Sequence, residues 1–192
     1  MAIEVRPASA ETWPDVERLM RTPGDPESCW CQVFRVPREE WEERPVERNR
    51  DDMRALVEAG RRPGLVAYDD GEPVGWCAVA PLTDYVRLAS SPYFAEVRPE
   101  GDDPSGRWAV TCFVVLPSAR GAGLVERMLD AAVEHARTHG ATGVEAMPLD
   151  VDNAAHVTAD ELYGGTLSAF EQAGFERLAQ LGPERVLVLH RF

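Results

Sequence analysis

The sequence WAVTCFVVLPSAR (residues 108–120), followed by GAGLVERMLDAAVEHARTHG (121–140) and ATGVEAMPL (141–149), decides the fold. The first segment is rich in β-branched and aromatic residues, which favours a mostly buried strand. In the second segment, apolar residues recur every three or four positions, as on one face of an amphipathic helix that ends at Gly140. Residues 144–147 predict another short strand. The stretch therefore predicts a strand–turn–helix–strand unit.

The turn between the first strand and the helix, Arg120-Gly121-Ala122-Gly123, carries the chemistry. Glycines allow a backbone to approach a ligand closely. The helix that follows presents its unpaired N–H groups and the positive end of its dipole at the same point. Together these features predict an anion site that suits phosphate. The glycine spacing fits neither the dinucleotide-binding fingerprint nor the nucleotide-hydrolase loop.

This turn resembles the acyl-CoA signature of the GNAT N-acetyltransferase superfamily, Q/R-x-x-G-x-G/A. Arg120 and Gly123 match its first two fixed positions, whereas Val125 stands where glycine or alanine is usual. The resemblance implies an α/β (α+β) fold: a single GNAT-like domain over residues 1–192, with a mixed sheet of about seven strands flanked by helices. It also implies that the two central strands splay apart to admit the pantetheine arm of acetyl-CoA.

The rest of the chain fits that element order. Strands are predicted at residues 3–6, 65–68, 74–80, 175–181 and 185–191, and helices at 10–20, 37–60 (interrupted at Pro45) and 167–173. Residues 81–106, which contain three prolines, are predicted to form a long loop that covers the substrate side. The sequence shows no repeat or linker that would indicate a second domain.

The resemblance also assigns residues to acetyl-CoA. Backbone groups of the first central strand would pair with the pantetheine, and the turn and first helical residues would hold the pyrophosphate. A second element, Phe170-x-x-x-Gly174-Phe175, resembles the family's closing Y-x-x-x-G-F, in which the tyrosine often protonates the departing thiolate. The implied cofactor contacts are Phe113, Val114, Val115, Arg120, Gly121, Ala122, Gly123, Leu124, Val125 and Phe170.

Because Phe170 lacks a hydroxyl, the general acid must come from elsewhere. Thr166, one turn earlier, and Tyr163 are the candidates for the general acid. An amine arrives protonated, so a base is also needed. Glu145 in the second central strand is our candidate, with Asp150 and Asp84 as alternatives, since a carboxylate in a buried strand would have a raised pKa.

We expect Trp30, Trp76, Asp84 and Tyr85 to contact the acceptor. The segment Cys29-Trp30-Cys31 allows three interpretations, namely metal ligands, buried packing or an aromatic lid over the substrate. We expect no metal, because zinc needs about four ligands and no further ligands are grouped with this pair. His135 and His139 lie four residues apart near the end of the central helix, where we expect both on its solvent face.

Composition and net charge limit the classes of molecule that the protein is expected to bind. The chain has 192 residues, 44% of them hydrophobic, and its net charge of −13 argues against nucleic acid and anionic membranes. No segment predicts a membrane helix or a signal peptide, so we expect a cytoplasmic protein. A homodimer is compatible with these features.

The implied function is an acetyl-CoA-dependent N-acetyltransferase that acts on a primary amine of a small molecule or peptide by direct attack in a ternary complex. One alternative is a non-catalytic acyl-CoA sensor of the same fold, which Val125 and Phe170 motivate. A second is an α/β protein whose glycine turn holds some other phosphate.

Overall fold

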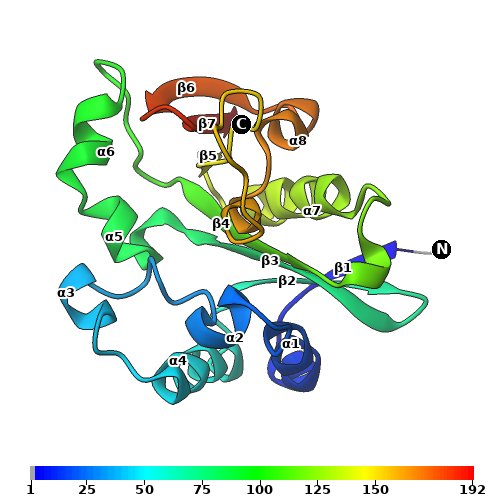
Figure 1. Ribbon diagram of the computed structural model, residues 1–192. Helices are drawn as coiled ribbons and strands as arrows, with labels where there is room; N and C mark the ends of the chain where they lie inside the picture. The colour runs from blue at the N-terminus through cyan, green and yellow to red at the C-terminus, as the bar shows by residue number, and fades with distance from the viewer. Residues whose placement is uncertain (1–2) are drawn as a thin grey trace.

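The computed structural model describes residues 3–192, which form one seven-stranded sheet in the order β1-β2-β3-β4-β5-β7-β6 (Figure 1). All neighbouring strands are antiparallel except β4 and β5, which are parallel. The seven strands predicted from the sequence are therefore present. Their bounds are β1 Ile3–Pro7, β2 Gly64–Asp69, β3 Glu72–Pro81, β4 Trp108–Val115, β5 Gly143–Ala146, β6 Glu176–Leu181 and β7 Arg185–Arg191.

Helices cover both faces of the sheet. In Figure 1, α1, α2 and α4 lie below it, whereas α7 and α8 lie above it. The small helices α3, α5 and α6 gather at one end, beside the strands. The bounds are α1 Trp13–Met20, α2 Asp25–Cys29, α3 Arg38–Trp41, α4 Val46–Glu58, α5 Val86–Ala89, α6 Pro92–Val97, α7 Leu124–Thr138 and α8 Leu167–Gln172, with single 3-10 turns at Ala10–Thr12, Leu82–Asp84, Pro117–Ala119 and Glu161–Gly164.

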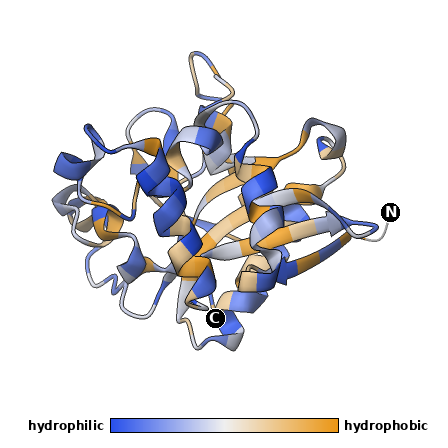
Figure 2. Cartoon of the chain, turned by 90° about the horizontal axis from the view of Figure 1, so that it is seen from below, coloured by the Kyte–Doolittle hydropathy of each residue, from blue (hydrophilic) through white to orange (hydrophobic). Residues whose placement is uncertain are grey.

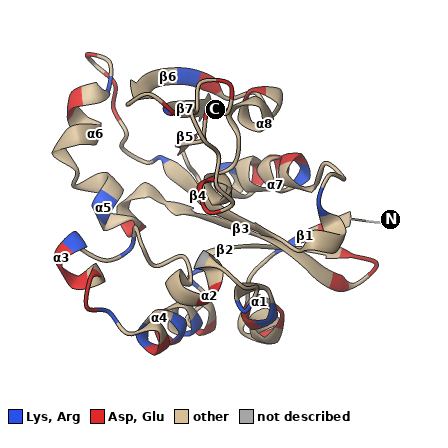
Figure 3. Cartoon of the chain, in the orientation of Figure 1, with Lys and Arg blue, Asp and Glu red and all other residues tan. Residues whose placement is uncertain are grey.

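Each face of the sheet has its own core. Apolar residues of α7 and α8 pack on one face, and those of α1 and α4 pack on the other. Figure 2 shows apolar strands between helices whose outer faces are hydrophilic, and Figure 3 shows that acidic and basic residues lie mostly on helices and loops. The amphipathic spacing of α7 produces this arrangement, because its apolar stripe faces the strands and its charged stripe faces water.

The two central strands separate after a short paired stretch. β4 and β5 pair only from Trp108 opposite Val144 to Val110 opposite Ala146, and β4 then continues alone to Val115. On its other side β4 carries a bulge, because Val110 and Cys112 oppose adjacent residues of β3 and leave Thr111 as the extra residue. A bulge bends its strand and redirects a side chain. The splay predicted from the family resemblance is confirmed.

One prediction of local structure needs correction, and another is confirmed. Residues 81–106 are not a structureless loop, since they contain α5 and α6, the latter capped by the Ser91 hydroxyl, which accepts from the Phe94 backbone N–H. Pro92 occupies the first position of α6, where a proline fits without losing a helical hydrogen bond. The interruption predicted at Pro45 within residues 37–60 is present, because α3 ends at Trp41 and Pro45 stands directly before α4.

Candidate functional site

The turn after β4 has the geometry that an anion site requires. Gly121 and Gly123 have φ angles of +73° and +69°, a left-handed conformation that side chains rarely adopt. A Cβ at Gly121 would meet no atom within 4 Å, and one at Gly123 would meet only the Glu126 carboxylate at 3.9 Å. Gly123 caps the N-terminus of the 15-residue helix α7, whose first N–H groups have no intrahelical partner.

Arg120 braces this turn, because its Nε donates to the Val115 carbonyl oxygen at 3.3 Å. Its side chain therefore folds back toward the end of β4 while remaining exposed. Leu124 is buried against the sheet, and Val125 packs at the edge of the same core. The turn thus exposes backbone and buries its flanking apolar side chains, as expected of a site for a ligand larger than an ion.

A cavity of about 700 Å³ opens where β4 and β5 separate. Val110, Thr111 and Cys112 of β4 line it, together with Met147 directly after β5. The other walls come from segments distant in the sequence: residues 26–41, α6, residues 160–164 and the turn between β6 and β7. Its volume lies in the range typical of small-molecule sites.

Buried contacts fix the wall that contains α2. Asn49 on α4 donates its side-chain amide to the Ser28 carbonyl at 2.9 Å, and the Trp30 indole donates to the Glu27 carbonyl at 2.9 Å. Trp30 and Cys31 both have positive φ angles, +46° and +52°, which costs about 1–3 kcal/mol per residue. Such strain often accompanies ligand sites and persists only where the surroundings enforce it.

Three thiols lie side by side in this wall. Cys29 and Cys112 line the cavity, and the thiol of Cys31 is hydrogen-bonded to both. The hydrogen bond to Cys112, reinforced by burial, raises the pKa of the Cys31 thiol well above its ordinary value. Cys31 is therefore a protonated, packed thiol. Among residues 3–192 no group of three or more side chains is arranged to hold a metal ion.

Three further residues give the cavity its polar character. Tyr163, a candidate general acid, lines it, and so do Asp160 and Arg185. The Arg185 guanidinium donates to the carbonyl oxygens of Met147 and Glu161, at 3.0 and 3.2 Å. Sequence reasoning missed Asp160 and Arg185, because a single acid in an irregular segment and an arginine in an edge hairpin carry no recognisable spacing.

The four residues expected to contact the acceptor lie outside the cavity lining. Trp30 is buried and stacks on Trp13 with 6.0 Å between ring centroids, whereas Trp76 is wholly buried between β3 and α1. Burial raises the pKa of Tyr85 to about 12, and its ring lies 4.5 Å beneath the Arg35 guanidinium. Asp84 pairs with the same arginine at 3.4 Å.

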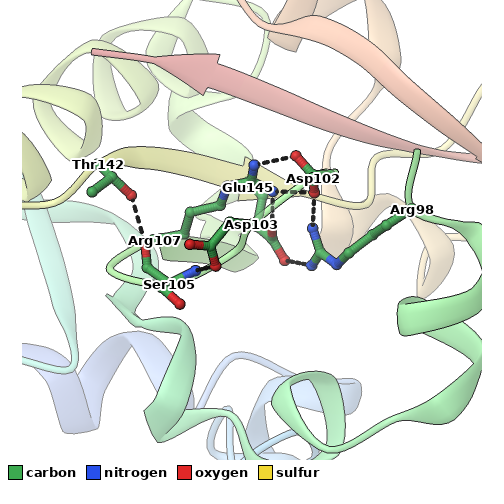
Figure 4. A network of polar contacts seen from close by, with 7 residues as sticks. All are labelled: Arg98, Asp102, Asp103, Ser105, Arg107, Thr142 and Glu145. Atoms are coloured by element: carbon green, nitrogen blue, oxygen red, sulfur yellow. Dashed lines mark hydrogen bonds and ion pairs between the residues drawn. The ribbon is translucent and has the colours of Figure 1, made fainter. Parts of the chain in front are cut away.

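Glu145, the expected base, occupies a buried ion network (Figure 4). Its two carboxylate oxygens bind Arg98 at 2.6 Å and Arg107 at 3.3 Å, and both arginines also bind Asp102. The guanidiniums of Arg107 and Arg98 hold the pKa of Asp102 below its usual range. Both oxygens of the Glu145 carboxylate are thus engaged by arginines, and the network ties β5 to the segment before β4.

The remaining expected residues are also accounted for. Phe170 is wholly buried and packs edge-on against Phe113 and Phe175, at 6.0 and 5.0 Å between centroids, so it belongs to the core beside β4. Thr166 lies outside the cavity lining, 3.3 Å from the Ser168 hydroxyl. Asp150 is buried and accepts from the Asn153 side chain at 2.8 Å.

His135 corrects another expectation, because it is buried rather than solvent-facing. Its ring lies edge-on to Trp108, with 5.4 Å between centroids, and burial lowers its pKa to about 4. His139 lies beside it and contacts Arg62 at 2.8 Å. The pair therefore packs the C-terminal end of α7 against β4.

Comparison with solved structures shows that the fold is that of acetyltransferases. An aminoglycoside acetyltransferase AAC(6')-Ib in complex with coenzyme A and kanamycin is 16% identical, with a TM-score of 0.56 over 99% of this chain and 95% of that chain. The PaiA N-acetyltransferase of Thermoplasma acidophilum in complex with coenzyme A is 14% identical, with a TM-score of 0.55 over the whole of both chains. A GNAT-family acetyltransferase of Streptococcus agalactiae is 14% identical, with a TM-score of 0.57 over 99% and 95%.

No helix among the described residues is both long and apolar enough to cross a membrane.

No curated protein matches the chain, whereas one family model does. The model of the acetyltransferase (GNAT) family matches residues 29–164, which include β4, the glycine turn and α7. The strand, turn and helix on which the sequence argument rests thus lie within the matched region, and the chain belongs to the GNAT acetyltransferase family.

Proposed function

We propose that this protein is an acetyl-CoA-dependent N-acetyltransferase whose acceptor amine binds in the cavity beside β4. One observation carries the proposal: the cavity opens where β4 and β5 separate, and β4 leads directly into the glycine turn. A site for the acceptor and a site for the donor's phosphates are thereby joined by one strand. This arrangement suits direct transfer between two bound substrates.

The residues present fit the coenzyme. Backbone N–H groups at the start of α7 and the unobstructed glycines 121 and 123 would receive the pyrophosphate. The unpaired edge of β4 over Phe113, Val114 and Val115, where β5 has diverged, would receive the pantetheine amides. Acetyl-CoA would supply an acetyl thioester, whose thiolate is a good leaving group near neutral pH.

Two side chains would handle protons. Among the side chains that the structure describes, Asp160 is the only carboxylate lining the cavity, and we assign it the ammonium proton of the acceptor, taken directly or through water. Tyr163, three residues further on, also lines the cavity, and we assign its hydroxyl the protonation of the departing sulfur. This assignment replaces Glu145 as the base and retains Tyr163 as an acid.

The sensor alternative rests on Phe170. It occupies the position of the family's usual tyrosine and is buried in the core, so it offers no proton donor. In that case the protein would bind acetyl-CoA without transferring its acetyl group. Release of free thiol that depends on an amine would exclude this alternative.

The first experiment is a thermal melt with acetyl-CoA, with ATP and NAD as controls. Ligand at one hundred times its Kd adds about 2.7 kcal/mol of stability. We expect a rise in Tm with acetyl-CoA and none with the controls, followed by thiol release when amines are added. The absence of any shift at millimolar acetyl-CoA would refute the proposal.

A further inference from the structure

Arg185, at the start of β7, lines the cavity, and none of the side chains that the structure describes places a carboxylate within ion-pairing distance of it. Its Nη atoms donate to two uncharged carbonyl oxygens, those of Met147 and Glu161. The nearby Glu161 carboxylate is exposed and already accepts two hydrogen bonds from Thr158, each 2.8 Å long. A positive charge in the wall of a cavity, not neutralised by a direct pair, favours an anionic ligand group.

The guanidinium is also held in place. Two carbonyl oxygens fix the plane of the fork, and Gly164 packs so closely that a Cβ there would lie 3.0 Å from Nη1. A guanidinium carries five N–H donors, more than these two carbonyls use, and Arg185 lines the cavity. A fixed, planar fork recognises a carboxylate through two parallel hydrogen bonds, and its prior immobilisation reduces the entropy lost on binding.

The rest of the cavity is mainly apolar. Aromatic side chains contribute much of the wall, whereas the exposed Asp160 is the only acidic group among the lining side chains that the structure describes. A polyamine or aminoglycoside would bring several ammonium groups into a space that offers one carboxylate among these side chains. Burying an unpaired ammonium is strongly unfavourable, so the cavity disfavours polycations. The aromatic lining residues are Phe34, Trp41, Tyr93, Phe94 and Tyr163.

We infer that the acceptor is a primary amine that carries one carboxylate on an aromatic or large aliphatic body, as the apolar α-amino acids do. Arg185 binds its carboxylate, the aromatic wall packs its body, and Asp160 lies on the side of its amino group. The cavity of about 700 Å³ holds such a molecule. This inference rests on the proposed acetyltransferase function and specifies its substrate class.

The test compares acceptors that differ in one group. Wild-type protein with acetyl-CoA is assayed for thiol release with L-phenylalanine, with phenethylamine (the same molecule without the carboxylate), with spermidine and with kanamycin. We expect kcat/KM for phenylalanine to exceed that for phenethylamine by at least tenfold, and spermidine and kanamycin to be poorer than both. Equal or faster turnover of phenethylamine, or a preference for either polycation, would overturn the inference.

The variant Arg185→Met tests the residue itself. It should reduce the ratio of kcat/KM for phenylalanine to that for phenethylamine from at least ten to about one. Arg177→Met on the neighbouring strand is the matched control, because Arg177 is exposed, pairs with Glu171 at 2.7 Å and lies outside the cavity lining. A ratio in Arg185→Met equal to that of the control would contradict the assignment. If Arg185→Met does not fold, the comparison of acceptors in wild type decides.

Two outcomes separate this inference from the function on which it rests. If acetyl-CoA stabilises the fold and kanamycin or spermidine is the acetylated amine, the acetyltransferase function stands and the substrate class is wrong. If acetyl-CoA does not stabilise the fold and no amine releases thiol, both the function and the substrate class are refuted.

Discussion

The glycine turn and the acceptor cavity are joined by β4, yet they are built in opposite ways. The turn is one continuous stretch, residues 120–125, that presents mostly backbone. The cavity is assembled from segments spread over residues 26–185 and presents side chains. A site made of backbone depends on glycines and a helix start, whereas a site made of side chains depends on which distant segments the fold brings together. The two regions should therefore respond differently to substitution.

The largest expected effect follows from Glu145→Gln, which tests whether this residue belongs to the cavity or to its support. Removing one carboxylate would leave two buried guanidiniums with only Asp102 between them, and breaking a buried ion pair typically costs 3–5 kcal/mol. For a chain of this size the Tm should fall by about 10 °C. Calorimetry provides the measurement.

The variant Glu145→Gln also distinguishes a structural role of this residue from a role as the catalytic base. At a temperature where Glu145→Gln remains folded, its kcat should stay within a few-fold of wild type. A kcat reduced more than a hundredfold with an unchanged Tm would return Glu145 to the role of base.

The turn is expected to lose ligand binding rather than stability. Gly123→Val forces a β-branched residue into a φ of +69° and places its side chain where the backbone should face the phosphates. We expect acetyl-CoA to bind at least a hundredfold more weakly in isothermal titration. Gly71→Val is the control, since Gly71 has a φ of +87° with open space around it in the β2–β3 turn. Equal affinity in the two variants would remove the turn from the coenzyme site.

The same contrast explains how much could be predicted from the sequence. The strand–turn–helix unit was predictable because its signals are local: a run of β-branched and aromatic residues, glycines and a helical period all fall within about forty residues. The residues that line the cavity were not predictable, because Arg185 and Cys112 come together only through the sheet order, in which β7 lies beyond β5. Trp76 was expected to contact the acceptor, but it faces α1 inside the core.

Glu145 illustrates a different limit. The prediction that a carboxylate in a buried strand is unusual was sound, but the cause is structural, because its partners Arg98 and Arg107 lie in a segment whose path the sequence does not indicate. A buried charge implies a partner, and the sequence does not reveal whether that partner is a substrate or the protein itself.

His135 on α7 should make the free energy of unfolding depend on pH. His135 near the end of α7 has a pKa of about 4 in the folded protein, against 6.5 ordinarily. As pH falls from 6.5 toward 4, the unfolded chain binds a proton that the folded chain does not, so stability is lost in that window by about 2 kcal/mol. His135→Phe keeps the packing against Trp108 and should flatten this slope in chemical denaturation. An identical slope in both proteins would exclude His135 as its cause.

The smallest effect belongs to the cavity and tests its proton donor. Tyr163→Phe keeps the ring in the wall and removes only the hydroxyl. Because a thiolate leaves readily near neutral pH, general acid assistance is worth less here than its usual hundredfold or more, and we expect kcat to fall about tenfold. The affinity for acetyl-CoA should stay constant. A tenfold increase in KM for the amine, with kcat unchanged, would make Tyr163 a binding residue of the cavity. A variant with the wild-type rate would show that this side chain does not assist departure of the thiolate.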